Sequence, residues 1–288
     1  MRITNSLQYT SLQTNIETSL EDLNGVQRQI STGKKLTTFS DDASGASQSL
    51  ALRSALDDNK QYQRDVDQAK SFLSAGDSAL GSANDILRSA RQIAVQGANS
   101  DQTPDQAAAL GAQVDGLVHQ LTQIANSDLH GKYLFGGTQT KVPPYDAAQN
   151  YQGNSAPLTA EIGSAYSLQI NTVGSTAFGP AFSALKSLKA DLTAGNAAAV
   201  SADIGQVDGA LTALNGARAG IGAKIDEVNG VQQRLTQAQG EYEGAVSNIE
   251  DVDLATAYVQ LQSAQNIYQA SLSTTAKAFQ YSLADYLH

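Results

Sequence analysis

The distribution of proline constrains this chain more than any other feature of its sequence. All 5 prolines of the 288 residues fall between positions 104 and 180. Proline lacks the backbone N–H and its ring clashes with the preceding turn, so it breaks helices in their interior. Residues 1–103 and 181–288 are free of this strongest helix breaker and can form long continuous helices.

Heptad patterns on both sides of the proline-containing segment predict long packed helices. Before that segment, one heptad position carries mostly large side chains, and it holds Val66, Leu73, Leu80, Leu87 and Ala94. The partner position carries small residues, namely Ala69, Gly76, Ala83 and Ala90. Small residues let a neighbouring helix approach closely. After that segment, apolar residues recur at steps of three and four from Val200 to Ile249, with polar interruptions at Arg218, Gln232 and Gln239.

Two shorter helices are predicted between these long ones. Thr103-Pro104 is a favourable helix start, and apolar residues at steps of three and four continue from there to Ile124. We expect this helix to run antiparallel to the one before it. Apolar residues from Phe182 to Leu192 predict the second short helix.

The sequence changes character between the two short helices. GKYLFGGTQTKVPPYD, residues 131–146, and the segment that follows are rich in Gly, Tyr and Thr. Tyr166, Leu168 and Ile170 alternate with other residues and are bounded by turn formers, a pattern typical of a strand. We expect residues 131–182 to form a small β-rich inserted domain.

Each end of the chain carries an apolar stripe detached from the main seam. Between Glu250 and Asp253 the C-terminal pattern slips by one residue, which rotates a helical stripe by about 100°. At the other end, a striped helix ends at Thr32-Gly33 and the helix-poor segment KKLTTF follows. We expect the two terminal helices to pack on each other.

These patterns predict a mainly α fold, a long antiparallel helical bundle or coiled coil formed by the N- and C-terminal halves with a small inserted β-rich domain. Residues 1–42 with 252–288 would form a terminal coiled-coil assembly domain. Residues 43–130 with 183–251 would form an elongated helical bundle, and residues 131–182 the β-rich domain.

Composition excludes several classes of function. The net charge is −10 and only 18 Lys and Arg residues are scattered along the chain, which argues against nucleic acids and anionic membranes. The absence of cysteine excludes disulfides, thiolate metal sites and cysteine nucleophiles. No run approaches the roughly 18 apolar residues of a membrane span, and MRITNSLQYT lacks the apolar core of a secretory signal peptide. We expect a protein that is cytosolic or exported by a route that reads another signal.

No pattern supports a catalytic, cofactor or metal site, and we expect neither an enzyme nor a small-molecule substrate. His119, His130 and His288 do not form a cluster with ligand spacing. Asp41-Asp42 is interpreted as helix capping rather than a paired-carboxylate site.

Three other features have competing interpretations. The glycines of NGARAGIGAKI, residues 215–225, resemble a phosphate loop, but no strand precedes them and the heptad pattern continues through them. Arg218 is either a buried charge that pairs with a carboxylate and sets helix register, or an exposed interface residue. Tyr258 and Tyr268 could line a groove but are more simply seam residues.

The terminal helices are expected to need partners beyond each other. Fully burying a Leu or Phe contributes about 1.5 to 3 kcal/mol, whereas ordering one residue costs roughly 1 to 2 kcal/mol of backbone entropy. Two helices that touch along one seam are therefore marginal. We expect both segments to be mobile in the free protein and to order on assembly. The expected assembly interface is Leu12, Ile16, Leu20, Leu23, Ile30, Leu254, Tyr258, Leu261, Tyr268, Leu272, Phe279 and Leu283.

Several stretches resemble the bacterial flagellin superfamily. ISTGKKLTTFSDDASGASQSLALRSAL, residues 30–56, is similar to its N-terminal signature. RAGIGAKIDEVNGVQQRL, residues 218–235, and the stretch from NIEDVDLA to DYL, residues 248–287, are similar to its C-terminal half. GKYLFGGTQTKVPPYD and the terminal SLADYLH look like the hook-associated branch rather than filament flagellins.

The resemblance implies a structural role in the bacterial flagellum, as a ring of copies that joins hook to filament. The implied partners are further copies of the chain, a neighbouring hook-associated protein, flagellin, and an export chaperone at the C-terminal region. Export would use the flagellar type III channel without a cleaved signal peptide. The alternatives are a filament-forming flagellin and a type III translocator-like protein that inserts into membranes.

Overall fold

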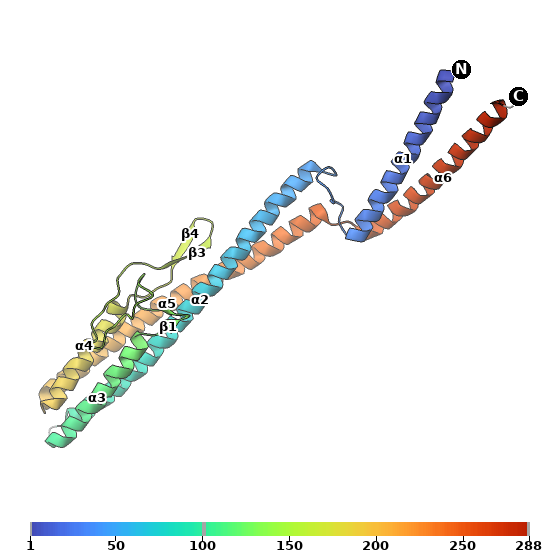
Figure 1. Cartoon of the computed structure of the whole chain (residues 1–288). Helices are drawn as coiled ribbons and strands as arrows, with labels where there is room; N and C mark the ends of the chain where they lie inside the picture. The colour runs from blue at the N-terminus through green and yellow to red at the C-terminus, as the bar shows by residue number, and fades with distance from the viewer. Residues whose placement is uncertain (1, 100–101, 287–288) are drawn as a thin grey trace. The chain divides into compact units, whose positions relative to one another are not determined.

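The computed structural model describes residues 2–99 and 102–286, with side chains described for residues 7, 10–99 and 102–277. Its helices are α1 (Arg2–Thr32), α2 (Ala43–Gly97), α3 (Pro104–Ala125), α4 (Gly174–Thr193), α5 (Ala197–Glu250) and α6 (Leu254–Tyr286). Helix makes up 75% of the chain, which confirms the predicted mainly α fold (Figure 1).

The chain divides into two compact units. Unit 1 contains Met1–Asp58 and Ala238–His288, and unit 2 contains Asn59–Gln237. Helices α2 and α5 contribute to both. Unit 1 is larger than the expected terminal domain because the beginning of α2 and the end of α5 are tied to the segments that connect them with α1 and α6.

The core of unit 2 follows the predicted heptad seam of α2. The large seam residues from Val66 to Ala94 are each at most 1% exposed, and the small partners Ala69, Ala83 and Ala90 are fully buried. Small residues bring the neighbouring helix close: a Cβ added to Gly76 would lie 3.4 Å from Ile221 of α5. The alternation of large and small side chains thus sets the spacing between α2 and α5.

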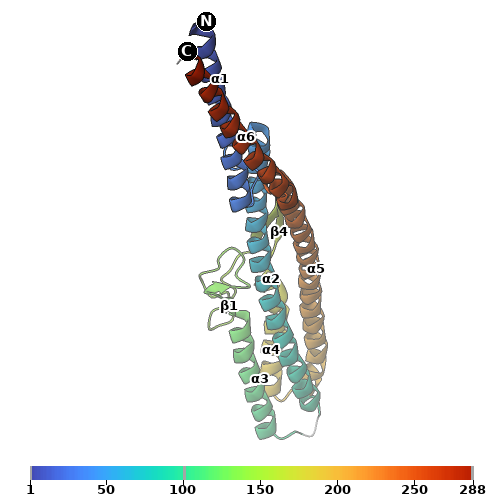
Figure 2. The same cartoon turned by 90° about the vertical axis from the view of Figure 1, so that its right-hand side faces the viewer.

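Polar contacts show that α2 and α5 run antiparallel within unit 2. Asp67 accepts a hydrogen bond from Gln232, and further along α2 Arg91 pairs with Asp208 at 2.7 Å. As residue numbers rise on α2 they fall on α5, as an antiparallel pair requires. The same two helices lie side by side in both views (Figures 1 and 2).

Helix α3 begins where the sequence predicts. The Thr103 side chain accepts a hydrogen bond from the Gln106 backbone, the Gln106 side chain accepts one from the Thr103 backbone, and Pro104 occupies the first turn. This reciprocal arrangement satisfies two of the backbone donors that a helix start leaves free. Helix α3 packs on α4, and Lys189 bonds Asp115 across the pair at 2.5 Å.

The β-containing region is smaller than predicted. Two antiparallel hairpins pair β1 (Asp128–Leu129) with β2 (Lys132–Tyr133), and β3 (Thr159–Gly163) with β4 (Tyr166–Gln169). Helix α4 then begins at Gly174, eight residues before the start expected from the Phe182 pattern, and contains Pro180 in its interior. The expectation that proline breaks a helix fails at Pro180, because burial of the apolar side chains of α4 outweighs the loss of one backbone hydrogen bond.

Aromatic side chains attach this region to α4. Phe135 packs edge-on against Phe178 with ring centroids 4.8 Å apart, and Tyr145 lies 4.7 Å from Phe182. The Tyr145 hydroxyl donates to the Gly174 carbonyl at 2.9 Å. Seven of the chain's 17 Phe and Tyr residues lie between Tyr133 and Phe182, where short strands need a large buried surface.

Candidate assembly interface

Helices α1 and α6 pack against each other within unit 1. Gly33 accepts a hydrogen bond from Val252 at one end of the pair, and Ser19 contacts Ser271 further along, so the helices are antiparallel (Figure 1). The expectation that the two terminal helices are partners is therefore confirmed.

The seam between α1 and α6 differs from the predicted one. On α1 the less exposed positions are Leu12, Ile16, Ser19, Leu23, Gly25, Val26, Gln29 and Ile30. On α6 they are Ala257, Leu261, Ala264, Gln265, Tyr268, Ser271 and Thr275. Apart from Gly25, Gln29 and Gln265, both sets step by three and four, as in a coiled coil.

The structure brings part of the predicted interface together. Leu12, Ile16, Leu23, Ile30, Leu261 and Tyr268 lie in the seam. Four predicted residues instead remain exposed: Leu20 at 39%, Leu254 at 49%, Tyr258 at 57% and Leu272 at 43%. Phe279 and Leu283 lie outside the residues whose side chains the structure describes.

Small residues explain the shift of the seam. Ala257 is only 1% exposed, and Ser19 contacts Ser271 at 3.4 Å between hydroxyl oxygens. The Ser19 hydroxyl donates to the Asn15 carbonyl, so the Ser271 hydroxyl is the donor across the pair. Sequence reasoning that follows large apolar residues misses such positions, because close approach of helices selects small side chains.

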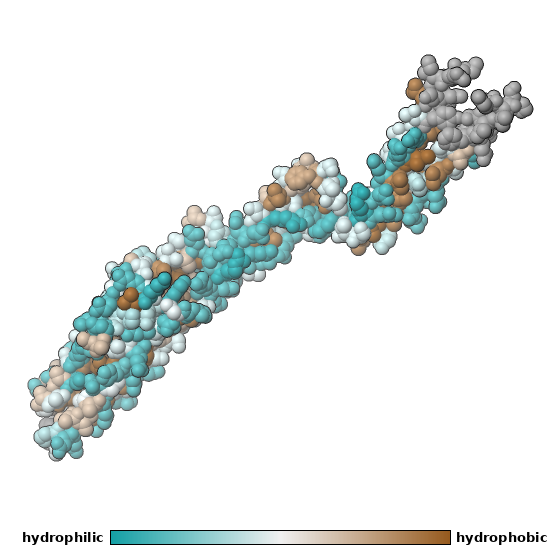
Figure 3. All heavy atoms as spheres, viewed as in Figure 1, coloured by the Kyte–Doolittle hydropathy of each residue, from teal (hydrophilic) through white to brown (hydrophobic). Residues whose placement is uncertain are grey.

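Exposed large apolar side chains concentrate in unit 1. Unit 2 contributes Val95, Val142 and Tyr166 to this set. Unit 1 contributes Leu7, Leu20, Phe39, Leu50, Leu254, Tyr258, Val259, Ile267 and Leu272. Figure 3 shows apolar surface over the α1–α6 pair and over the segment before α2. Large apolar side chains that stay exposed in one part of a protein are typical of an interaction site.

Backbone hydrogen bonds join the segment after α1 to the end of α5, a region that we call the junction (residues 33–36, 49, 53 and 248–252). The Lys35 N–H donates to the Glu250 carbonyl at 2.7 Å, and the Val252 N–H donates to the Gly33 carbonyl at 2.9 Å. The Lys35 ammonium also donates to the Asn248 carbonyl. Gly33 adopts φ +71°, a conformation that glycine accepts readily at a helix C-terminus.

The Glu250 carboxylate is the centre of the junction. It is 9% exposed and accepts hydrogen bonds from the Arg53 guanidinium at 2.7 and 2.6 Å, from the Ser49 hydroxyl, and from the Lys34 ammonium at 3.0 Å. The hydrogen bonds from Arg53 hold the pKa of Glu250 well below its ordinary value of 4.5, and the hydrogen bonds from Ser49 and Lys34 lower it further. The sequence indicated only that the apolar pattern breaks at this residue.

Of the two aspartates that were expected to cap α2, Asp42 does so and Asp41 does not. Asp42 accepts from the backbone N–H groups of Ser44 and Gly45 and caps α2. Asp41 instead accepts from the backbone and hydroxyls of Thr37 and Thr38, and the backbone bonds keep its pKa far below its ordinary value. Beside this turn, a hollow lies between Phe39, Leu50 and the junction.

The remaining candidate residues make ordinary contacts. Arg218 is 39% exposed and forms a two-pronged ion pair with Asp77 at 3.0 and 3.1 Å, so the paired-charge interpretation is correct although the charge is only partly buried. His119 is exposed at 71%, and His130 lies in the β1–β2 turn. His288 lies outside the described residues.

Within the described ranges, no three His, Cys, Asp or Glu side chains are grouped as metal ligands would be. None of the described helices has the length and apolar character needed to cross a membrane.

Comparison with known families agrees with this architecture. The model of the bacterial flagellin N-terminal helical region matches residues 3–140, and that of the C-terminal helical region matches residues 204–287. These ranges contain α1, α2 and α3 on one side, and most of α5 with α6 on the other.

Curated relatives include both hook-associated proteins and flagellins. Flagellar hook-associated protein 3 of Salmonella typhimurium is 31% identical over 180 residues, which are 62% of this chain and 57% of that protein. Flagellin FljO of Caulobacter vibrioides is 28% identical over 283 residues, 96% of this chain and 93% of that protein. The chain therefore matches less than two thirds of the hook-associated relative.

Solved structures show the same fold. FlgL of Bacillus cereus has a TM-score of 0.62 and 21% identity, and covers 68% of this chain and 99% of its own. A putative flagellar hook-associated protein of Vibrio parahaemolyticus has a TM-score of 0.68 and 20% identity, and covers 73% and 100% respectively. Two family models at the two ends of the chain and a shared helical fold lead to one conclusion: this chain belongs to the bacterial flagellin family.

Proposed function

We propose that this chain is a structural component of the bacterial flagellum, that copies of it assemble as a ring through α1 and α6, and that the ring joins hook to filament. The observation that carries this proposal is the exposed apolar surface of unit 1 on a chain of the flagellin family. Its partners would be a neighbouring hook-associated protein and flagellin, with an export chaperone at the C-terminal region. No enzymatic activity is part of the proposal.

Exposed apolar side chains on α6 would favour assembly. Leu254, Tyr258, Ile267 and Leu272 are each 43 to 57% exposed. Covering the remaining half of such a side chain contributes about 1 kcal/mol, so these four contribute about 4 kcal/mol per copy. Because this surface is covered only when another molecule binds, assembly would also stabilise α1 and α6 by mass action.

The hook-associated relative favours a role as connector between hook and filament over a role as filament subunit. The chain is 31% identical to hook-associated protein 3 of Salmonella typhimurium in the region of the match. The competing candidate is a filament-forming flagellin, which the nearly full-length match to FljO supports. We propose the connector role. Formation of long fibres by the purified protein alone would instead be evidence for a filament-forming flagellin.

The α6 surface can be tested by substituting Leu272 with Asp in the full chain. This side chain is 43% exposed beside the α1–α6 seam, so we expect α1 and α6 to pair as before, while incorporation into flagella and motility are lost. Gln262→Asp is the matched control, because Gln262 is also exposed on α6 and the same charge is introduced. We expect that control to assemble normally.

A covalent readout separates failed assembly from failed pairing. Ser19 and Ser271 face each other, so Ser19→Cys with Ser271→Cys should form a disulfide within one copy under mild oxidation. That bond should form equally well in the Leu272→Asp background. Normal motility of the Leu272→Asp strain, with the protein present in its flagella, would contradict the proposed interface.

A further inference from the structure

Asp203 of α5 is a buried carboxylate without a cationic partner. It is 1% exposed, one carboxylate oxygen accepts a hydrogen bond from the Gln206 amide at 2.9 Å, and the other oxygen accepts no hydrogen bond. An unpaired buried charge is strongly unfavourable, and such a group normally becomes neutral. The Asp203 side chain belongs to unit 2.

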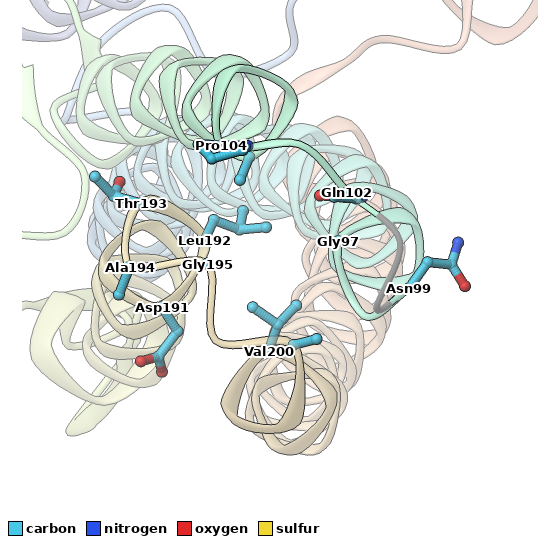
Figure 4. Close-up of a pocket in the computed structure, with 12 residues that line it drawn as sticks. Gly97, Asn99, Gln102, Pro104, Asp191, Leu192, Thr193, Ala194, Gly195 and Val200 are labelled. Atoms are coloured by element: carbon cyan, nitrogen blue, oxygen red, sulfur yellow. The ribbon is translucent and has the colours of Figure 1, made fainter.

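The neighbour that Asp203 faces is a second carboxylate. Asp191, on the last turn of α4, lies within hydrogen-bonding reach of the Asp203 side chain. Figure 4 shows Asp191 with its carboxylate directed away from the hollow that Leu192 and Val200 line. Two ionised carboxylates are both acceptors, so neither can donate to the other.

The nearby cations are engaged elsewhere. Arg91 of α2 pairs with Asp208 of α5, and Lys189 of α4 pairs with Asp115 of α3. The residues of α2 and α3 that line the hollow beside Asp191 carry no charge; they are Gly97, Pro104 and Ala107. The negative end of the α4 helix dipole adds further negative potential around Asp191.

The pKa of Asp203 is raised from an ordinary value of 3.8 to about 6. Burial is the larger cause, and the negative charge of Asp191 is the second. A proton satisfies this pair better than a metal ion. Calcium and magnesium require about six or more oxygen ligands, whereas only two carboxylates meet here. One proton on Asp203 removes the buried charge and supplies the missing donor.

We propose that Asp203 and Asp191 share one proton and thereby form a pH-sensitive tie between α4 and α5. In the protonated state the Asp203 hydroxyl donates to the Asp191 carboxylate. Loss of the proton places two negative charges side by side, one of them buried, and loosens this end of unit 2.

The sign of the pH dependence follows from proton binding. The folded form of Asp203 binds its proton more tightly than the open form, so the tie is fully present below pH 3.8 and is lost as the pH rises through 6. Between pH 5 and pH 8 the equilibrium constant for local opening should increase about 10-fold.

Two measurements on the full chain test the tie. The carbon chemical shift of the Asp203 carboxyl group should titrate with a midpoint near 6; a midpoint at or below the ordinary value of 3.8 would overturn the proposal. Hydrogen exchange in residues 190–210, corrected for the intrinsic effect of pH, should show the 10-fold change as faster exchange at pH 8. Equal protection at both pH values would also overturn it.

Substitutions separate the tie from general stability. Asp203→Asn supplies a permanent neutral donor, so we expect protection of residues 190–210 to vary less than about 2-fold between pH 5 and pH 8. Asp191→Asn should move the Asp203 titration to lower pH. Asp226→Asn, at an exposed position of the same helix, is the control and should behave as the unmodified chain. If Asp203→Asn does not fold, the titration of the unmodified chain still decides.

Discussion

Arg53 and Glu250 form a two-pronged ion pair, with Nε to Oε1 at 2.7 Å and Nη2 to Oε2 at 2.6 Å. The pair connects the beginning of α2 to the end of α5, at the residue where the apolar pattern of the sequence changes phase. Lys34 and Ser49 contact the same carboxylate. Glu250 therefore fixes the path of both connecting segments that lead to α1 and α6.

Replacing Glu250 with Gln should destabilise unit 1. The change removes the charge that Arg53 and Lys34 share, and both partners are partly exposed, so we expect a loss of about 1 to 3 kcal/mol. Denaturant unfolding followed by a probe on α1 measures it. The control is Glu243→Gln, an exposed position of the same helix, for which a change below about 0.5 kcal/mol is expected. Equal stability of both variants would show that the junction contributes little.

The same carboxylate predicts an acid dependence. The folded pKa of Glu250 lies below its ordinary value of 4.5, so its contribution is present above pH 4.5 and is lost as the pH falls below it. Stability of unit 1 should fall on acidification in the unmodified chain and fall less in Glu250→Gln. A parallel pH profile for the two proteins would contradict this assignment.

Hydrogen exchange on the free protein should show that α1 and α6 open far more readily than the core of unit 2. The terminal seam buries few large side chains, whereas Leu73, Leu80 and Leu87 of α2 are at most 1% exposed. We expect rapid exchange in residues 5–30 and 255–285 and slow exchange around Leu80. Slow exchange in both terminal segments of a lone copy would show that they do not need partners.

Two glycines should respond in opposite directions to alanine. A Cβ on Gly216 of α5 meets open space, so Gly216→Ala should stabilise unit 2 by about 0.5 to 1 kcal/mol. A Cβ on Gly97 would overlap with Leu192, which is only 1% exposed, so Gly97→Ala should cost about 1 to 3 kcal/mol. Thermal unfolding of both variants measures the contrast. A stabilised Gly97→Ala variant would mean that α4 can shift away.

Much of the helical framework follows from local sequence. The α2 seam, the start of α3 at Thr103-Pro104 and the break between α5 and α6 were all predicted, because each depends on residues close together in the chain. Helical periodicity repeats within two turns, so a single stretch contains enough information to identify it. The same reasoning failed at Pro180, where buried packing of α4 overrides local preference.

The sequence by itself determined that the chain forms long helices, where most of them begin and end, and that each end carries an apolar stripe. Only the tertiary structure decided that Ala257, Ser19 and Ser271 lie in the terminal seam while Leu254, Tyr258 and Leu272 stay exposed. It also decided that Ser49, Arg53 and Lys34 meet at Glu250. These pairings join residues about 200 or more positions apart, and the distance at which two helices pack depends on both surfaces at once, which no local pattern contains.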